Sequence, residues 1–189
     1  MYTRQAKRSG RGPVVARFDT GWGEGAVTVL GGRLVAIDLP SDGRSVAAAS
    51  DAEGLAPGDR EVMRRWVSEL EAYFRGDRLG WTAEEICVGE LEVPAFDRKV
   101  YEALLSIPPG STVGYGALAE LAGFPRAARA VGNAMASNPI PIVVPCHRVV
   151  YADGRLGHYG DDDSWKPRLL AHEERHASAI PAGQGRDDR

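Results

Sequence analysis

The sequence predicts an α+β protein in which a small mixed unit at residues 13–90 precedes a mainly helical unit at residues 91–177. Three observations lead to this class. Two segments rich in β-forming residues flank a Gly-Gly pair, an amphipathic helical pattern spans residues 59–74, and three further helical segments follow Pro94. The chain has 189 residues, of which 43% are hydrophobic and 26% charged, as in ordinary globular proteins that bury a core.

The first unit begins with a predicted hairpin. The segments Ala26–Leu30 and Leu34–Leu39 contain mostly β-forming residues. Gly31-Gly32 between them suits a tight two-residue connection, because glycine adopts the positive φ angles that such turns need. A further turn is predicted at Ser41-Asp42-Gly43.

A helix is predicted over residues 59–74, with Asp59 as its expected N-cap. The apolar residues recur at helical spacing and are expected to face the core: Val62, Trp66, Leu70 and Tyr73. Residues 76–90 form a predicted connection, in which Cys87 lies between Ile86 and Val88 and is expected to be a core thiol.

The second unit opens with a helix over residues 96–106, which Pro108-Pro109-Gly110 terminate. A pattern similar to helix-turn-helix follows: a helix over residues 115–122, a turn at 123–125, and a helix over 126–137 with Pro125 in its first turn. Sequence alone leaves two interpretations of the second helix open. Its many alanines and glycines suit close approach to a narrow minor groove, and they equally suit close helix packing.

The charge pattern permits modest affinity for nucleic acid. The net charge is −3, which argues against an avid polyanion binder. The segment 111–150 is nevertheless basic, with Arg126, Arg129 and Arg148 against Glu120 alone.

The sequence has no apolar run of membrane-spanning length and no signal-peptide core, so we expect a cytoplasmic protein without membrane contact. The basic residues 1–12 and the tail 178–189 are expected to be disordered.

The strongest chemical signal is a cysteine next to a histidine. The apolar run Ile140–Val144 predicts a buried strand or extended segment, which Cys146 and His147 follow directly. A solitary cysteine is usually a core residue, but an adjacent imidazole makes this one a candidate nucleophile. Neighbouring side chains of an extended chain point to opposite faces, so we expect His147 to act on the thiol through a bridging water. Neither cysteine has the CxxC spacing of a zinc site, and no metal is expected.

The segment around Cys146 resembles the O6-alkylguanine-DNA alkyltransferase family. The resemblance rests on PCHRV preceded by NPIPI, on ARAVGNAMASNP upstream and on LLAHE downstream, and it is strong over residues 93–173. It implies a ribonuclease-H-like N-terminal domain and a winged-helix-like second domain. It also implies single-turnover transfer of an alkyl group from O6-alkylguanine, and from O4-alkylthymine, in double-stranded DNA, after the nucleotide is flipped from the minor groove.

The resemblance assigns roles to individual residues. Cys146 is similar to the alkyl acceptor, His147 to the base that acts through water, and Glu173 to the carboxylate that orients this base. Asn138 resembles the residue that braces the active-site turn. Tyr115 resembles the tyrosine that rotates the phosphate and donates a proton to the base.

The resemblance also assigns residues to the DNA-binding surface of the protein and to its substrate pocket. Arg129 resembles the arginine that fills the gap left by the flipped guanine. The family's DNA contacts map to Arg126, Ala127, Ala128 and Arg129, together with Tyr115, and its substrate pocket to Pro141, Val149, Tyr159 and Gly160. Lys166 matches the lysine in the segment that leads into LLAHE. The family implies no cofactor, and we expect a monomer.

The sequence departs from the family after Tyr159. Small residues usually follow this tyrosine, whereas Gly160 is followed here by Asp161, Asp162 and Asp163. Three accounts are open: the carboxylates point into solvent, they repel DNA phosphates, or they reshape the pocket.

Three other functions compete with this one. A lesion sensor without repair activity usually has tryptophan in place of the cysteine, so Cys146 argues against it. A protein for a specialised bulky or cationic adduct would use the same chemistry and could explain the acidic run. A cysteine hydrolase is disfavoured, because its thiolate and imidazolium must touch.

Overall fold

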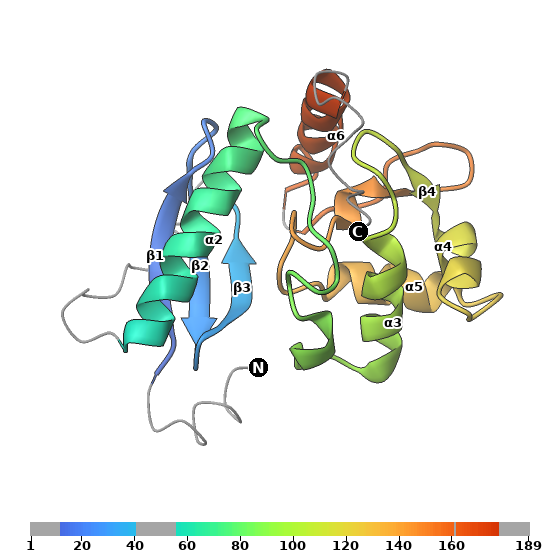
Figure 1. Cartoon of the computed structure of the whole chain (residues 1–189). Coiled ribbons are helices and arrows are strands. Elements are labelled where there is room, and N and C mark those ends of the chain that lie inside the picture. The colour runs from blue at the N-terminus through green and yellow to red at the C-terminus, as the bar shows by residue number, and fades with distance from the viewer. Residues whose placement is uncertain (1–11, 41–55, 161, 178–189) are drawn as a thin grey trace, which may run out of the picture.

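The structure is a computed structural model and describes residues 12–40, 56–160 and 162–177. Figure 1 shows two halves side by side, one made of a sheet with a long helix across it and the other of shorter helices. No helix in these ranges is long and apolar enough to cross a membrane. The turn predicted at residues 41–43, the N-terminal residues 1–11 and the tail 178–189 lie outside the described residues.

The first half contains a three-stranded antiparallel sheet in the order β1 (Val14–Asp19), β2 (Glu24–Leu30) and β3 (Arg33–Asp38). The predicted hairpin is confirmed, and both glycines of the turn between β2 and β3 have positive φ. Strand β1 was not predicted. Phe18 is its only fully buried residue, so the segment lacks the alternation of apolar and polar residues that marks a half-buried strand.

Helix α2 (Pro57–Arg75) packs across this sheet and ends at Gly76, whose φ is 84°. Trp66, Leu70 and Tyr73 are buried on its inner face, as the spacing predicts. The prediction that Asp59 caps the helix is wrong. The helix begins two residues earlier at Pro57, and the Asp59 carboxylate accepts a hydrogen bond from the backbone N–H of Gly32.

The connection to the second half contains the short 3-10 helix η2 (Val88–Glu90). The prediction that Cys87 is a core thiol is wrong, because its side chain is exposed. Its neighbours Ile86 and Val88 are buried, and Cys87 between them has a left-handed backbone with φ of 50°. The change of direction at Cys87 buries the two neighbours and leaves the thiol outside.

The second half contains α3 (Ala95–Leu104), α4 (Tyr115–Leu121), α5 (Ala128–Ala136) and α6 (Trp165–Ala177). Helices α4 and α5 pack together and correspond to the predicted helix-turn-helix pair. Helix α5 begins two residues later than predicted, because Arg126 has a φ of 68° that a helix cannot contain. Pro125 is therefore part of the turn and not of the helix.

Two short strands, neither of them predicted, complete this half. Strand β4 (Val113–Gly114) pairs in parallel with β5 (Val149–Val150), which follows the Cys146 segment. Each strand has only two residues, too few to produce a period in the sequence. Their pairing nevertheless fixes the chain that leaves Cys146 against the chain that enters α4.

The two halves meet around the Cys146 segment. The N–H of Ile37 in β3 donates to the carbonyl of Pro139 at 2.9 Å. The indole N–H of Trp165 in α6 donates to the carbonyl of Pro40 at 2.7 Å. A guanidinium nitrogen of Arg148 donates to the carbonyl of Leu79, also at 2.7 Å. These bonds attach the turn before Cys146, the turn after it and α6 to the N-terminal half.

Candidate active site

The chain before Cys146 folds into a buried turn, and the predicted strand or extended segment over Ile140–Val144 is wrong. The Val144 N–H donates to the Ile140 carbonyl at 2.9 Å, and Pro141 and Val144 form an isolated bridge. Ile142 has a φ of 73°, a conformation rare for a β-branched residue. The apolar run is thus core packing within a turn, and the 3-10 helix η3 (Cys146–Arg148) follows it.

Asn138 connects this turn to the Cys146 thiol. Its amide nitrogen donates to the Val144 carbonyl at 2.9 Å and to the Cys146 Sγ at 3.1 Å. Its amide oxygen accepts from the Ile140 N–H at 3.1 Å. The thiol is only 6% exposed, and burial raises its pKa, against the opposing effects of the Asn138 hydrogen bond and the Lys166 charge. A thiol in this setting stays protonated at neutral pH and needs a base to ionise.

His147 and Glu173 form a fully buried pair, with the His147 Nε2 at 2.7 Å from the Glu173 Oε1. Burial alone would raise the pKa of Glu173, but the hydrogen bonds and charges of His147 and Arg148 hold it far below its usual range. A carboxylate can only accept, so the Nε2 carries the proton. The Nδ1 is buried and has no hydrogen-bond partner within the described part of the chain.

The charge state of His147 suits a base. Burial lowers the pKa of His147, and the hydrogen bond and charge of Glu173 offset this only in part. The imidazole is therefore neutral near physiological pH and has a free lone pair at Nδ1. The structure shows no hydrogen bond between His147 and the Cys146 thiol. The two residues occupy one 3-10 turn, not the opposite faces of an extended chain.

Arg148 is buried and was predicted only as one of the basic residues of its segment. It donates to both carboxylate oxygens of Glu173, each at 2.9 Å, and to the carbonyls of Leu79 and Ile107, each at 2.7 Å. It therefore adds nothing to the surface charge. The basic surface of this region rests on Arg126 and Arg129, which are both exposed.

Tyr115 and Lys166 lie close to each other and both interact electrostatically with Cys146. The Lys166 ammonium lies 6.0 Å from the Tyr115 ring centre, and its charge acts on Cys146. Burial raises the pKa of Tyr115, and the proximity of Tyr151 and Cys146 raises it further, so its hydroxyl stays a donor. A Cβ atom on Gly157 would lie 2.7 Å from this hydroxyl, so a larger residue there would displace the Tyr115 hydroxyl.

Tyr159 is buried, with its ring centre 6.4 Å from that of His147. Its hydroxyl is near enough to the thiol to lower the pKa of Cys146, but it has no partner in hydrogen-bond geometry among the described residues. Of the other expected pocket residues, Val149 is fully buried in β5, Pro141 is half-buried in the turn, and Gly160 is exposed with a φ of 56°.

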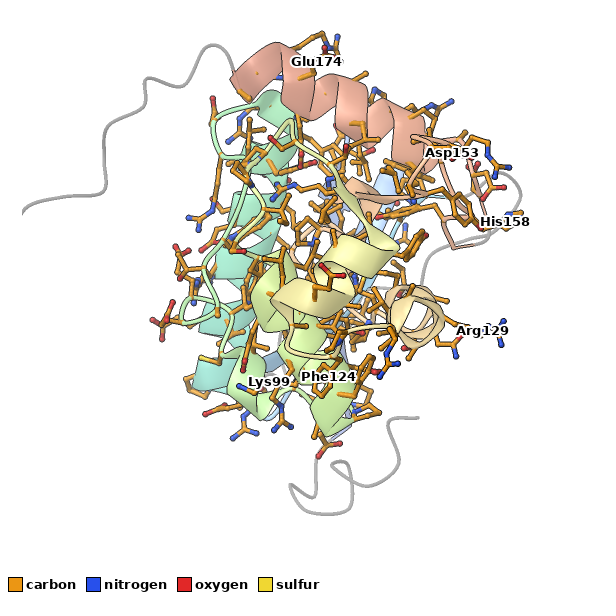
Figure 2. All side chains as sticks on the ribbon, turned by 90° about the vertical axis from the view of Figure 1, so that its right-hand side faces the viewer. Lys99, Phe124, Arg129, Asp153, His158 and Glu174 are labelled. Carbon is orange, nitrogen blue, oxygen red and sulfur yellow. The ribbon has the colours of Figure 1, made fainter. Side chains whose placement is uncertain are left out.

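Helix α5 presents a small-residue face to solvent. Ala127 and Ala128 are half-buried at its start, and its exposed residues are Arg129, Ala130, Asn133 and Ala136. Figure 2 shows Arg129 projecting from the molecule on the side where Asp153 and His158 also lie. This face bears one long cation among short side chains, so a ligand surface can approach the helix backbone closely.

Two acidic residues of the loop after Tyr159 are engaged with the backbone. Asp163 accepts from the Tyr159 N–H at 2.8 Å and contacts the His158 Nδ1 at 2.9 Å. Asp162 accepts from the Ser164 N–H at 2.8 Å, one residue before α6. Asp161 lies outside the described residues. These hydrogen bonds hold the loop in its shape, and the sequence did not indicate this role for the two aspartates.

Two further features were missed in the sequence. Tyr73 is buried as predicted, but its hydroxyl also donates to Glu173.

His172 and His176 have the HxxxH spacing that is typical of zinc ligands, and the expectation of no metal did not take this pattern into account. The His172 Nε2 lies 2.7 Å from the Tyr73 carbonyl, and the His176 Nδ1 lies 2.8 Å from the His172 carbonyl. The His172 ring therefore joins α6 to α2, and the His176 ring packs against His172 and Gly76 at the end of α2.

The chain has similarity to proteins of one family. Residues 95–175 match the family described as 6-O-methylguanine DNA methyltransferase, DNA binding domain. The methylated-DNA–protein-cysteine methyltransferase of Mus musculus is 42% identical over 160 residues, which cover 80% of this chain and 72% of that protein. The one from Mycolicibacterium paratuberculosis is 48% identical over 113 residues, 60% of this chain and 66% of that protein.

Solved structures agree over most of the chain. The O6-methylguanine methyltransferase of Mycobacterium tuberculosis matches with a TM-score of 0.66 at 31% identity, covering 91% of this chain and 97% of that one. A structure of Mycobacterium tuberculosis OGT in complex with DNA matches with a TM-score of 0.68 at 33% identity, covering 86% of this chain and 93% of that one.

Proposed function

The chain belongs to the methylated-DNA–protein-cysteine methyltransferase family, and we propose that it repairs DNA by transferring an alkyl group from O6 of guanine to its own Cys146. One observation carries the choice of acceptor and base. The Cys146 thiol is buried next in sequence to His147, whose Nε2 is held by Glu173 and whose Nδ1 has no hydrogen-bond partner among the described residues. We call Cys146, His147 and Glu173 the relay.

The relay supplies a nucleophile that the buried thiol alone would not provide. Through one water molecule, the thiol proton passes to the His147 Nδ1, and Glu173 stabilises the imidazolium that forms. The thiolate attacks the alkyl carbon, the bond from this carbon to O6 breaks, and a thioether forms. The guanine gains a proton from the Tyr115 hydroxyl, which regains one from the imidazolium. A thioether is a very poor leaving group, so each protein molecule reacts once.

The DNA-binding surface is assigned to the two residues before α5, to its first turn and to its exposed face. Arg126, Ala127, Ala128 and Arg129 lie there, and the short side chains favour close approach to a minor groove. Arg129 is proposed to occupy the gap that the flipped nucleotide leaves in the duplex, where it offsets part of the cost of unstacking. Tyr115, Pro141, Val149, Tyr159 and Gly160 are proposed to form the pocket for the flipped base.

The finer architecture is also part of the proposal. We assign residues 13–90 to a ribonuclease-H-like domain and residues 91–177 to a winged-helix-like domain. The α4–α5 pair and the small β4–β5 sheet support the second assignment. We propose that the protein acts as a monomer on double-stranded DNA and that it also accepts alkyl groups from O4-alkylthymine.

Intact-mass spectrometry after incubation with an O6-methylguanine oligonucleotide tests the reaction. The protein should gain the mass of one methylene unit. Cys146→Ser should abolish the gain, whereas Cys87→Ser, which removes the exposed thiol, should leave it complete. An unchanged wild-type mass together with tight binding of the lesion would replace this proposal with a lesion sensor.

A further inference from the structure

Tyr73 brings a hydroxyl from the N-terminal half to the relay. It lies near the end of α2, is fully buried, and donates from its hydroxyl to the Glu173 Oε1 at 3.0 Å. The two residues are 100 positions apart in the chain, and Figure 1 shows the end of α2 at the same end of the molecule as α6.

The Glu173 carboxylate receives more donors than it has good acceptor positions. The Oε1 meets Tyr73, His147 and Arg148, and the Oε2 meets Arg148 and the backbone N–H of Gly110 at 3.1 Å. A carboxylate offers about four lone-pair positions, two on each oxygen. Tyr73 and His147 therefore compete for the electron density of one oxygen atom.

The hydroxyl is not needed for the packing of the Tyr73 ring. The ring packs against Trp81, Phe74 and His172, with centre distances of 6.0, 5.4 and 5.3 Å, and a phenylalanine would make the same contacts. A buried hydroxyl costs free energy unless it is hydrogen-bonded. Here its partner is the carboxylate that orients the proposed base, so the hydroxyl acts on the chemistry of the site.

We infer that Tyr73 is a positioning residue for the relay, which holds the Glu173 Oε1 toward His147 and limits how basic the His147 imidazole becomes. This inference rests on the proposed function. Two other bonds hold the end of α2 and the segment after it near the relay, one between the His172 Nε2 and the Tyr73 carbonyl and one between Arg148 and the Leu79 carbonyl. The N-terminal half thereby takes part in transfer without touching the substrate.

The direction of the effect follows from the shared oxygen. Without the Tyr73 hydroxyl, the Oε1 becomes a better acceptor for the His147 Nε2–H and stabilises the imidazolium more. The pKa of His147 then rises, and less neutral base is present at acid pH. The other ionisable groups around the pair stay in place: Cys146 and Arg148 on η3, Lys166 and His172 on α6, and Tyr159 on the loop before it.

The test is the pH dependence of single-turnover alkyl transfer from free O6-benzylguanine, which avoids effects on DNA binding. Tyr73→Phe should move the acid limb of the rate profile to higher pH by on the order of half a unit, a fraction of the worth of a hydrogen bond to a charged group, because the Glu173 Oε1 keeps Arg148 as a donor. Tyr101→Phe is the matched control, because Tyr101 is equally buried and donates at 2.9 Å to the Ala134 carbonyl. Its profile should coincide with that of the wild type.

A second variant keeps the test valid if Tyr73→Phe folds poorly. With 3-fluorotyrosine at position 73, the hydroxyl is a stronger donor, so the acid limb should move to lower pH. Profiles of both position-73 variants that coincide with the wild type would overturn the inference, as would equal shifts in Tyr101→Phe. Glu173→Gln distinguishes failure of the relay from failure of the role of Tyr73. If Glu173→Gln also leaves the pH profile unchanged, the relay is wrong. If Glu173→Gln changes the profile and the position-73 variants do not, only the role of Tyr73 is lost.

Discussion

Burial acts in opposite directions on the two groups that we propose exchange the proton. It raises the pKa of the Cys146 thiol and lowers that of the His147 imidazole. Each shift favours the neutral form, so the resting site is a thiol next to a neutral base and not an ion pair. Glu173, which its partners keep anionic, would lower the free-energy cost of charging His147 in the proposed transfer.

This account predicts how changes in the base affect the reaction. His147→Gln should slow alkyl transfer by about two orders of magnitude, the usual contribution of a general base, while the affinity for lesion DNA stays the same. Wild-type transfer should slow as the pH falls through the lowered pKa of His147, because protonation removes the free lone pair. Stopped-flow transfer assays at several pH values measure both effects. A Glu173→Gln protein with wild-type rates from about pH 6 to pH 9 would refute the relay.

The residues of the site and the pairing of His147 with Glu173 were predictable from motifs, but two further partners of Glu173 were not. Cys146, His147 and Glu173 belong to short segments whose resemblance to one family is local in sequence. The hydroxyl of Tyr73 and the guanidinium of Arg148 act through contacts 100 and 25 residues away, and only the fold determines such distances. For the same reason, the sequence predicted which residues of α2 face the core, but it did not predict the hydrogen bond that the Tyr73 hydroxyl makes there.

At the scale of elements, α5 combines a single long cation with short side chains. If Arg129 fills the gap left by a flipped nucleotide, it acts only when the lesion is in duplex DNA. Arg129→Ala should therefore reduce transfer from a duplex far more than transfer from free O6-benzylguanine. The comparison of the two second-order rate constants measures this. Equal losses on both substrates would mean that Arg129 serves the structure of the helix.

The loop after Tyr159 offers a comparison between charge and hydrogen bonding. Asp163→Ala removes both the carboxylate charge and the acceptor of the Tyr159 N–H, whereas Asp163→Asn keeps the acceptor. If the bond shapes the pocket, only the alanine variant should change the ratio of transfer rates from methyl and benzyl adducts.

Electrostatic repulsion of DNA would give a different pattern for the same two variants. Both would then tighten DNA binding, most strongly at low salt, and the slope of affinity against salt concentration would steepen in both. Affinities at two salt concentrations distinguish this outcome from pocket shaping. An unchanged rate ratio and unchanged affinities would leave the loop as a solvated turn and remove both roles.

Elements with a periodic pattern were predictable, and those defined by backbone reversal were not. The hairpin and α2 follow from β-forming residues, glycines and apolar spacing. The apolar run Ile140–Val144 has the composition of a strand, but the chain reverses its direction at Ile142. The apolar side chains of this run are therefore buried in the core from a turn. Arg126 and Cys87 have positive φ as well, and each lies where a sequence prediction failed.

At the scale of the molecule, the buried Arg148 joins the two halves through Leu79, Ile107 and Glu173. Arg148→Met should lower the free energy of unfolding by about 3–5 kcal/mol, because it leaves a buried carboxylate with fewer partners. Arg155→Met, which removes an exposed ion pair with Asp153, should have no measurable effect. Denaturant unfolding curves test both variants. A loss for Arg148→Met no larger than for Arg155→Met would contradict the role of Arg148 as a link between halves.

Each protein molecule is proposed to accept one alkyl group, on Cys146. The most direct test incubates the protein with an excess of O6-methylguanine duplex, counts repaired lesions, and locates the methyl group by tandem mass spectrometry of peptides. The account predicts one repaired lesion per protein molecule and complete methylation of the peptide containing Cys146, with the Cys87 peptide unmodified. Repair of many lesions by each molecule, or a methyl group on any residue other than Cys146, would contradict it.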